Sequence, residues 1–598
     1  MGFRTIYSVL EATAQAHGNA PALYQPIGKG KYQTYSWTDY RQAAQEIACG
    51  LRRLGFKKGD IIALHAETRA EFYLADLGIM ANGSIAAALY TSYPLPDQIG
   101  NLRSSDAKAI FVEDPKSMRA LKAASGEPGL PVQWILLTGD AENTLTLEQL
   151  RADGRRALAE DSQAFEKIRS EVSQQDMAIL YLTSGATGEP KMGLVSHAAL
   201  VANLDMGPVA LPLYPSDSTI SFLPSAHIAQ RVVIQLLPMR MGVPVWFSES
   251  LARLPNEMKT IRPTFLLAPP RVWERIFASI HTEIKKRGRL SQKLFHGAVG
   301  LGAEVSRLRE EGKPVPRLMQ TSLKVADRLV FSKIRKRLGG RLRVAASGAA
   351  PLGKELARFY AAVGMPLIEG YGLTEGGVVC LNPLDRPKSG SVGVKLRGVE
   401  LRLAGDGELL VKSPALFSGY YKDPAATAAV LRDGWLYTGD IGEVDSDGYF
   451  YITGRKKELI VSSNGKKIYP ARIEGLFKTE PIVNQVVLIG DRLPFVTALV
   501  TVNVANAETL KGMEPFHGRE PHEVALAAPV LAEVQGAVAR VNKQLAPFEQ
   551  IRRFRVLERD FSIETGELTP TMKVRRSRVL ENYRSLVSEL YMGKEESQ

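Results

Sequence analysis

Apolar and polar positions follow two different rhythms along the first 250 residues of the chain. Between Tyr40 and Leu54 the apolar residues recur at helical spacing, which predicts an amphipathic helix. Short apolar runs at Ile61–His65, 107–112 and 132–137 predict buried strands. Helices that alternate with buried strands are typical of a largely parallel sheet, so we predict an α/β fold.

The pattern then changes twice. Residues at about 276–340 are rich in Lys, Arg and Leu at helical spacing and predict a helical insertion. From about 399 to 453, short strands separated by Asp-Gly turns predict an antiparallel β subdomain. A dense charged segment around Gly454 precedes a compact α+β region. We therefore predict a large domain, 1–455, of two α/β subdomains and the β subdomain, followed by a small C-terminal domain, 456–598.

Composition and charge narrow the class of protein. The chain is 45% hydrophobic and 23% charged, which is ordinary for a globular protein. Two cysteines exclude a disulfide scaffold and favour a reducing compartment. The net charge of +13 favours anionic partners such as nucleotides, CoA or an anionic membrane surface. Nucleic acid is not expected, because no recognised binding motif occurs.

The chain lacks an apolar run that would span a membrane. The most apolar long stretch, Leu74–Tyr90, is interrupted by Asp76, Asn82 and Ser84, whereas a spanning helix needs about 20 largely apolar residues. No signal-peptide pattern follows the start of the chain. We expect a soluble cytoplasmic protein and leave open both contact with a membrane surface and assembly into a homodimer.

A glycine-rich segment after a predicted strand is the first candidate for chemistry. The apolar run 177–182 leads into hydroxyl and glycine residues and ends in a lysine; the candidate phosphate ligands are Thr183, Ser184, Gly185, Thr187, Gly188 and Lys191. Backbone N–H groups, hydroxyls and one ammonium on such a loop can bind phosphate. It is not a Walker A loop, because Gly-Lys-Ser/Thr is missing. A plain turn between strand and helix is the alternative.

Three further segments follow predicted strands. His227 opens an apolar helix, although a core or capping histidine is the alternative. The small residues of 344–351 allow a flat ring to approach the backbone. In the segment 368–375, Tyr371 can stack on a base, and Thr374 and Glu375 can reach a phosphate and its metal. The alternatives are a tight turn and a buried tyrosine beside an exposed glutamate.

The last two segments lie near the predicted domain boundary and beyond it. Asp440, which we place at a strand end, can accept hydrogen bonds from both hydroxyls of a ribose. The basic segments 451–467 and 568–576 can face anionic ligands, although such charge runs are usually solvated faces. Each alternative is reasonable alone, but all six segments in this order point to a nucleotide site.

In this order the segments resemble those of adenylate-forming enzymes, the superfamily of acyl-CoA synthetases, luciferases and peptide-synthetase adenylation domains. The resemblance runs from about residue 5 to 585. It is strongest toward long-chain fatty acyl-CoA synthetases, because of the segment Arg262–Ile276 and the helical insertion.

The resemblance implies a role for each matching residue. Residues 183–191 would cover the β- and γ-phosphates, and Asp440 and Arg455 would bind ribose. The adenine pocket would be lined by Gly348, Ala349, Ala350, Glu369, Gly370, Tyr371 and Gly372. The residues implied in catalysis are Thr374 at the α-phosphate, Glu375 on Mg²⁺, His227 near the acyl carboxylate and Lys573 of the C-terminal domain.

The implied reaction has two steps. ATP activates a fatty acid to an acyl-adenylate with release of pyrophosphate, and CoA then accepts the acyl group with release of AMP. The small domain would rotate between the steps about Lys457, and the turn Ser463, Asn464 and Gly465 would line the path of the thiol. ATP, Mg²⁺ and CoA are therefore the expected cofactors and co-substrates, with a fatty acid as substrate.

Two residues depart from the usual family pattern. Ala186 replaces a threonine of the glycine-rich loop, and Met192 stands where a glycine is usual. Both put loop mobility and ATP affinity in doubt. Two other functions stay open: a ligase that passes the acyl group to a carrier protein, and a non-catalytic nucleotide or lipid sensor.

Overall fold

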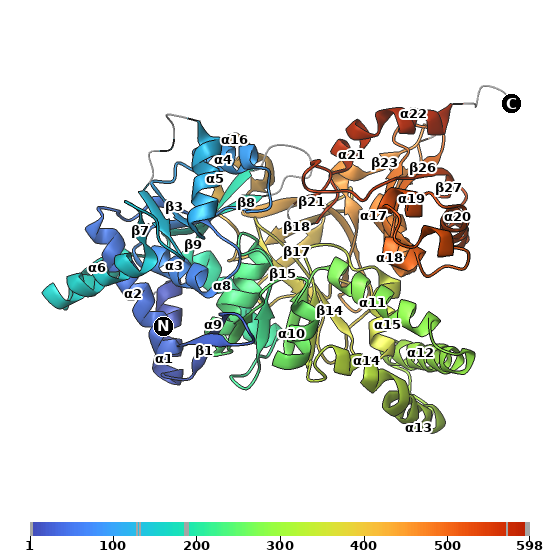
Figure 1. The fold of residues 1–598 in the computed structure, drawn as a ribbon, viewed down its shortest axis with the longest axis horizontal. Helices are drawn as coiled ribbons and strands as arrows, with labels where there is room; N and C mark the ends of the chain where they lie inside the picture. Colours follow the sequence, from blue (N-terminus) through green and yellow to red (C-terminus); the bar gives the residue numbers. More distant parts are fainter. Residues whose placement is uncertain are drawn as a thin grey trace.

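The computed structural model describes residues 4–126, 130, 133–183, 191–463, 465–569 and 572–592. Several residues singled out in the sequence lie outside the described part, namely Ser184, Gly185, Ala186, Thr187, Gly188 and Asn464. Figure 1 shows a broad body with the C-terminal region at one side of it. No described helix has the length and apolar character that a membrane span requires.

The first large sheet is built from the buried apolar runs. Its order is β19-β9-β8-β4-β3-β5-β6-β7, and β3 to β8 pair in parallel. Residues of β3, β4 and β5 are buried without exception, as expected for parallel strands covered on both faces. The strands are β3 Ile61–His65, β4 Ile85–Ala88, β5 Ala109–Val112, β6 Gln133–Leu136, β7 Leu145–Thr146, β8 Met177–Thr183, β9 Lys191–Ser196 and β19 Gly419–Tyr420. The strand predictions at 61–65, 107–112, 132–137 and 177–182 are thus confirmed.

The second large sheet carries much of the cleft described below. Its order is β16-β15-β14-β13-β12-β10-β11-β1-β2, with a parallel centre from β1 to β14 and antiparallel edges. The strands are β1 Pro21–Pro26, β2 Tyr32–Ser36, β10 Thr219–Ser221, β11 Val245–Phe247, β12 Phe265–Ala268, β13 Val344–Ser347, β14 Leu367–Leu373, β15 Gly377–Leu381 and β16 Val394–Lys395.

Helices cover these two sheets, as the α/β prediction requires. The predicted amphipathic helix is α2, Trp37–Arg53, which begins at a capping box made by Ser36 and Asp39. The others are α1 Ile6–His17, α3 Ala70–Ala81, α4 Leu95–Ser104, α5 Pro115–Ser125, α6 Leu147–Glu160, α7 Ala164–Glu171, α8 His197–Ala210, the π-helix η1 Gln230–Leu236, α9 Leu237–Met241, α10 Leu254–Ile261 and α15 Lys354–Ala362. Cys49 in α2 and Cys380 in β15 are buried and not joined to each other.

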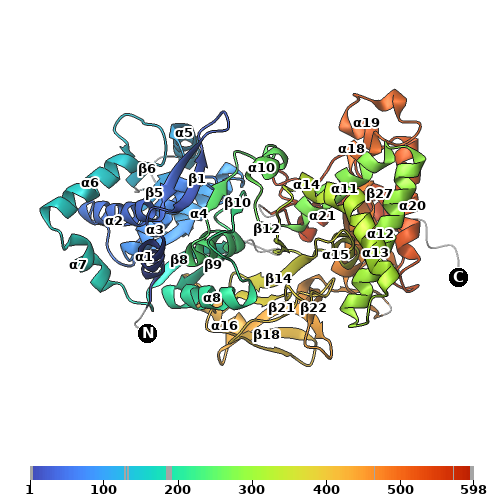
Figure 2. The ribbon, with the colours of Figure 1, turned by 90° about the horizontal axis from the view of Figure 1, so that it is seen from below.

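The basic segment at 276–340 consists of helices, which project at one edge of the body in Figures 1 and 2. The long helix α12 packs Phe295, Ala298 and Val305 inward, toward α15. Gly302 lies at this contact, where a methyl group would collide with the backbone carbonyl of Ala362. The helices are α11 Pro270–Lys285, α12 Arg289–Glu310, α13 Arg317–Ala326, the π-helix η2 Asp327–Phe331 and α14 Ser332–Arg337.

Short antiparallel strands follow, as the turn signals predict. They form a sheet in the order β17-β18-β21-β20, with β22 paired to β21. The elements are β17 Glu400–Leu403, β18 Glu408–Lys412, α16 Pro424–Val430, β20 Leu431–Arg432, β21 Trp435–Val444 and β22 Phe450–Arg455.

The C-terminal region has its own sheet and apolar core. The antiparallel pair β25–β26 and the parallel pair β26–β27 form a three-stranded sheet around a separate cluster of buried residues. The elements are η3 Lys456–Glu458, β23 Ile460–Val461, β24 Lys467–Ile468, α17 Pro470–Leu476, η4 Phe477–Thr479, β25 Val483–Ile489, β26 Val496–Val502, α18 Val504–Ala507, η5 Glu514–Phe516, α19 Pro521–Ala525, α20 Ala528–Asn542, β27 Ile551–Val556, α21 Arg576–Asn582 and α22 Arg584–Tyr591. A domain boundary at 455/456 stays a prediction.

Candidate functional site

A cleft of about 2280 Å³ lies where the large sheets, the β subdomain and the C-terminal region meet. Its wall includes residues from segments that are hundreds of positions apart in the sequence. The sequence-predicted residues in this wall are Thr183, Lys191, His227, Ala349, Ala350, Glu369, Gly370, Tyr371, Gly372, Thr374, Glu375, Asp440, Arg455, Lys457 and Lys573. One cleft therefore brings together most of the candidate residues that the structure describes.

The candidate metal ligand and the loop lysine share a tyrosine as neighbour. The Tyr420 hydroxyl donates a hydrogen bond of 2.6 Å to Oε1 of Glu375. The Lys191 ammonium lies 4.9 Å from the centre of the Tyr420 ring. Burial and the Glu375 carboxylate raise the pKa of Tyr420, so the hydroxyl stays protonated and donates. Tyr420 thus orients the carboxylate, a role for which its local sequence carries no signal.

A carboxylate and a guanidinium face the cleft from neighbouring strands. Asp440 in β21 pairs in register with Arg455 in β22, and Nε of Arg455 lies 2.9 Å from Oδ1 of Asp440. The Tyr371 hydroxyl donates to Oδ2 of the same carboxylate at 2.6 Å. A carboxylate has about four acceptor positions, so Asp440 can still accept from a diol.

The expectation that Asp440 ends a strand is wrong. β21 runs from Trp435 to Val444 and passes through Asp440, because the hairpin partner Arg455 continues the pairing there. The Gly439–Asp440 pair has the composition of a turn, but its neighbours lie within the ladder.

A buried carboxylate, that of Glu369, lies in the cleft wall near the segment of small residues that follows β13. Burial raises the pKa of Glu369 to about 7, against the effect of the N–H of Gly390, which donates to Oε1 at 3.2 Å. Ser347 ends β13 with a buried hydroxyl that has no hydrogen-bond partner among the described residues. Ala349 follows in the left-handed region, at φ 70°. Glu369 and Ser347 therefore offer polar groups beside a backbone that a planar ring can approach.

Lys573 reaches the cleft from the C-terminal region. Burial lowers its pKa to about 8 and the positive charge of Arg455 acts in the same direction, while Asp440, Glu375 and Glu458 oppose the shift. The backbone of Lys573 is hydrogen-bonded to Thr569, which fixes the turn that carries it. Its ammonium forms no hydrogen bond or ion pair with another described residue, so it can bind a ligand.

His227 lies near Lys573 at the start of the η1 helix. Its Nδ1 accepts a hydrogen bond of 3.2 Å from the N–H of Ala229. Burial lowers the pKa of His227 to about 3, and the positive charge of Lys573 contributes in the same direction. The imidazole is therefore neutral at physiological pH. The alternative of a capping histidine is partly correct, because Nδ1 does accept from the helix start.

The same helix carries a buried ion pair one turn later. Arg231 and Asp76 are both fully buried and in contact, and Gln235 donates to the second oxygen of Asp76 at 2.8 Å. A buried carboxylate and guanidinium need each other, since an unpaired charge in a core is strongly destabilising. This pair ties the η1 helix to α3 and fixes the direction from which His227 enters the cleft.

Three predicted residues that the structure describes do not line the cleft wall, namely Ser463, Gly465 and Gly348, whereas Met192 lines it from a strand. Ser463 and Gly465 lie in a turn outside the wall, where the Ser463 N–H donates to the carbonyl of Leu493 and the Gly465 N–H to that of Ser462. A methyl group at Gly348 would lie 3.7 Å from the carbonyl oxygen of Gly370, so Gly348 lies close to the backbone of β14. Met192 is buried in β9 and paired with Leu182, so it belongs to the sheet core rather than to a loop.

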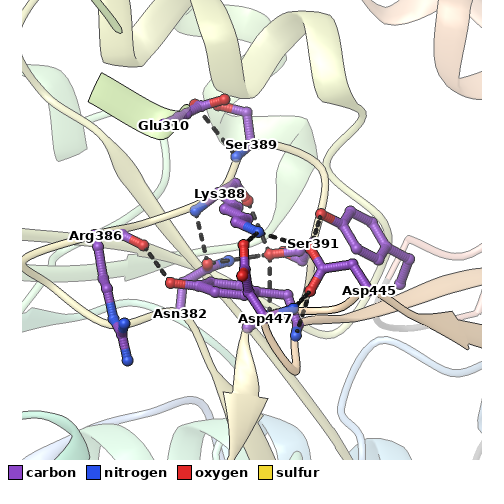
Figure 3. A network of polar contacts seen from close by, with 11 residues as sticks. Glu310, Asn382, Arg386, Lys388, Ser389, Ser391, Asp445 and Asp447 are labelled. Carbon is purple, nitrogen blue, oxygen red and sulfur yellow. Dashed lines mark hydrogen bonds and ion pairs between the residues drawn. The ribbon is translucent and has the colours of Figure 1, made fainter. Parts of the chain in front are cut away.

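A polar network that the sequence did not reveal lies at the cleft wall, to which Gly390 and Asp445 belong (Figure 3). The Lys388 ammonium binds Asp445 at 2.8 Å and Asp447 at 2.5 Å, at the turn between β21 and β22. Ser389, the next residue, donates to Glu310 at the end of α12 at 2.7 Å. Because Gly390 also holds Glu369, this loop connects three parts: the hairpin, the helical insertion and the cleft.

Ion pairs and hydrogen bonds hold the C-terminal region in its orientation. The Lys478 ammonium lies 3.0 Å from Glu274 of α11 and also donates to the carbonyl of Pro351. Arg271 of α11 donates to the carbonyl of Asn484. These contacts join the C-terminal region, which carries Lys573, to the part of the chain that forms the large sheets.

The donor set fits a cation that is held partly by a substrate. No group of three or more His, Cys, Asp or Glu side chains gathers as a metal cage within the described part of the chain. Tyr420 donates its hydrogen bond to Oε1 of Glu375 and leaves the other carboxylate oxygen without that bond. Mg²⁺ typically uses one or two carboxylates together with phosphate oxygens and waters, and this arrangement suits Glu375.

Comparisons with known proteins give the family of the chain. Residues 10–421 match the model of the AMP-binding enzyme family, and residues 457–595 match its C-terminal domain. The chain is 34% identical to the long-chain-fatty-acid–CoA ligase FadD15 of Mycobacterium bovis, over 93% of this chain and 92% of that protein. It is 29% identical to human long-chain-fatty-acid–CoA ligase 1, over 98% of this chain and 86% of that protein.

Solved structures show the same fold. The anthranilate CoA ligase AuaEII, solved in complex with anthranoyl-AMP, superposes with a TM-score of 0.73 at 18% identity, over 98% of each chain. This likeness confirms the predicted α/β architecture with a large N-terminal and a small C-terminal part. The family model covers more than half of the chain, and the chain therefore belongs to the AMP-binding enzymes.

Proposed function

We propose that the protein is an ATP-dependent ligase that joins a long-chain fatty acid to CoA through an acyl-adenylate. The observation that carries this proposal is the arrival of Lys573, from the C-terminal region, in the cleft that holds Glu375, Asp440 and Arg455. The names of the relatives give the substrate class. ATP, Mg²⁺ and CoA are the cofactors and co-substrates, and acyl-CoA, AMP and pyrophosphate are the products.

The first step places a carboxylate next to a polyphosphate, so charge must be neutralised. A carboxylate oxygen of the fatty acid attacks the α-phosphorus, and the bond to pyrophosphate breaks. Lys573 and Lys191, which both line the cleft, supply positive charge for the phosphates, and Thr374 donates to the α-phosphate. Because Nδ1 of neutral His227 accepts from the N–H of Ala229, its proton is on Nε2, which donates a hydrogen bond toward the acyl carboxylate without adding charge.

The nucleotide is bound by the fixed walls of the cleft. Asp440 and Arg455 hold the ribose hydroxyls, and Tyr371 with its neighbouring glycines faces the base. Glu375 holds Mg²⁺, which neutralises phosphate charge when bound. Thr183 and the loop that follows β8 cover the outer phosphates; of that loop, Ser184, Gly185, Thr187 and Gly188 lie outside the described residues.

The second step transfers the acyl group to the thiol of CoA and releases AMP. Lys573 must then leave, because it occupies the space through which the pantetheine arm would enter. Rotation of the C-terminal region about Lys457 moves the lysine out and turns Ser463 and Gly465 toward the cleft. Lys466 and Lys467, beside that turn, are suited to the phosphates of CoA.

Product analysis over a panel of acids tests this function. We expect pyrophosphate release to rise from acetate to palmitate and to stay low with aromatic acids. CoA consumption should match pyrophosphate release one to one. Acyl-hydroxamate formation without CoA consumption would instead favour a ligase that serves a carrier protein. Nucleotide binding with neither product would favour the sensor.

We further propose that the protein resides in the cytoplasm and contacts a membrane surface peripherally. The net charge of +13 supports attraction to anionic lipid headgroups. A long-chain fatty acid is itself found in membranes, since its chain partitions out of water.

A further inference from the structure

The helical insertion exposes large apolar side chains to solvent. On α12, Leu290 is 82% exposed and Leu294 is 48% exposed. The two are four residues apart and so share one side of the helix. On the neighbouring helix that runs from α13 into η2, the exposed apolar residues are Leu318 at 80%, Val325 at 55% and Leu329 at 45%. A single exposed apolar side chain is common, but four leucines and one valine on two adjacent helices call for an explanation.

Basic residues accompany these apolar side chains. Residues 285–297 and 317–337 contain twelve Lys and Arg against a single acidic residue, Asp327. These two short segments therefore hold most of the positive excess of the whole chain, whose net charge is +13. Lys293, Lys324 and Arg328 are exposed and form no ion pair with any side chain that the structure describes. Such a field attracts an anionic surface.

The two helices are firmly attached to the catalytic body. The inner side of α12 packs against α15 at Gly302, where a side chain would collide with Ala362. The far end of α12 is held by the hydrogen bond of 2.7 Å between Ser389 and Glu310 (Figure 3). The exposed side of α12 and α13 therefore does not belong to the apolar core of the fold, and it faces outward at one edge of the body (Figures 1 and 2).

From these observations we infer that the exposed side of α12 and α13–η2 is a docking surface for an anionic lipid bilayer. Leucines and valine enter the headgroup region, and the flanking Lys and Arg bind lipid phosphates, as in helices that lie on membranes. A protein partner would need complementary shape, whereas a bilayer needs only an apolar side and positive charge. The purpose, delivery of a membrane-held fatty acid, rests on the proposed function; the binding itself does not.

Vesicle flotation of the full-length protein tests the surface. We expect binding to phosphatidylcholine vesicles that contain phosphatidylglycerol, weaker binding to pure phosphatidylcholine, and loss of binding at high salt. The variant Lys293→Glu/Lys324→Glu/Arg328→Glu should bind at least about 100-fold more weakly, because each basic residue contributes about five-fold near an anionic surface. The variant Leu290→Gln/Leu318→Gln/Val325→Gln should lose about 10-fold or more.

Matched controls keep the result specific. The variant Leu251→Gln/Val209→Gln removes two exposed apolar residues, 60% and 65% exposed, from elsewhere on the surface. The variant Arg119→Glu/Lys511→Glu/Lys543→Glu makes the same change of net charge at scattered exposed sites. Both should bind vesicles as the unaltered protein does. If the charge-reversed control lost as much vesicle binding as the charge-reversed test variant, the proposed docking surface would be wrong, since net charge alone would then explain binding.

Activity and oligomeric state separate the remaining outcomes. With fatty acid supplied on albumin, the test variants should keep full activity, and with fatty acid embedded in anionic vesicles they should lose it in proportion to binding. Binding that survives both test variants, or a change from dimer to monomer in sedimentation, would contradict a lipid-docking role. Normal vesicle binding without any ligase activity would refute the proposed function and leave the docking surface standing.

Discussion

The cleft is built from two kinds of part: fixed walls and one inserted lysine. Asp440, Arg455 and Tyr371 lie on strands, and a hydrogen bond of 2.6 Å and an ion pair of 2.9 Å hold their side chains to one another; Glu375 lies in the turn between β14 and β15. Lys573 lies between β27 and α21, and its ammonium forms no hydrogen bond or ion pair with another residue in the part of the chain that the structure describes. The walls are thus assembled before a ligand binds, whereas the lysine is presented by a separate unit.

This difference suggests a division of work. Groups that are fixed to each other suit the nucleotide, which stays bound through both steps. A group whose position depends on contacts between two regions suits a step that must end. The walls should therefore matter in both half-reactions, and Lys573 in the first one alone. Each of the following experiments can break that division.

The largest effect is expected for Lys573→Ala. Loss of a well-placed charge-stabilising group typically lowers a rate about 100- to 1000-fold, and we expect that loss in pyrophosphate release. Acyl transfer from synthetic acyl-adenylate to CoA should persist. Lys543→Ala, an exposed lysine of the same region outside the cleft wall, serves as the control and should be unchanged. Unchanged pyrophosphate release in Lys573→Ala would show that the division of work is wrong.

The next largest effect is expected for Asp440→Asn. Hydrogen bonds to a charged group contribute about 1.5–3 kcal/mol, so the KM for ATP should rise roughly 10- to 100-fold. The same variant should bind synthetic acyl-adenylate more weakly, because ribose is present in both steps. Tyr371→Phe, which removes one hydrogen bond to Asp440 and no charge, should have a smaller effect in the same direction. An Asp440 variant that affects one half-reaction alone would contradict the claim that the wall residues act in both half-reactions.

The wall residues could be predicted from the sequence because they are close together in the chain. Tyr371, Thr374 and Glu375 fall within five consecutive positions, and Asp440 and Arg455 face each other across one hairpin. The strand end expected at Asp440 was wrong, since a glycine-aspartate pair can lie inside a ladder as well as in a turn. The placement of Lys573 came from the family resemblance, because no local pattern brings a residue near the end of the chain to His227.

Other parts of the site could not be predicted from the sequence. Tyr420 meets Glu375, Lys478 meets Glu274, and Ser389 meets Glu310 across 45, 204 and 79 residues. Each is an ordinary polar residue in its own segment. Only the packing of whole elements creates these contacts, so local periodicity and motif spacing carry no information about them.

The pH dependence of the rate should differ between the first half-reaction, which uses Lys573, and the second, which does not. Because the pKa of Lys573 is lowered to about 8, its positive charge is present below that pH and is lost above it. We expect kcat/KM for ATP in the first half-reaction to fall about ten-fold per pH unit above about 8. The second half-reaction should lack this limb. His227, with a pKa of about 3, stays neutral and adds no limb between pH 5 and 7.

Two variants identify the groups behind these limbs. Lys573→Arg should remove the alkaline limb, because a guanidinium stays charged. Glu369, whose pKa is about 7, would add a limb near neutral pH if its charge matters for adenine binding. Glu369→Gln mimics the protonated form and should remove such a limb without moving the one near 8. An alkaline limb that survives Lys573→Arg would assign it to another group.

The smallest effect is expected at the contact between the two regions. Glu274→Gln weakens the pair with Lys478, which is 3.0 Å long and joins side chains that are 13% and 22% exposed. Partly exposed ion pairs contribute at most about 1 kcal/mol, so pyrophosphate release should fall about two- to five-fold while acyl transfer to CoA stays equal or rises. Glu283→Gln is the matched control, because Glu283 lies on the same helix α11 but pairs with Arg287 and Arg337 of the large domain. A Glu274 variant that slows both half-reactions equally would mean that this contact supports the fold of the cleft rather than the position of Lys573.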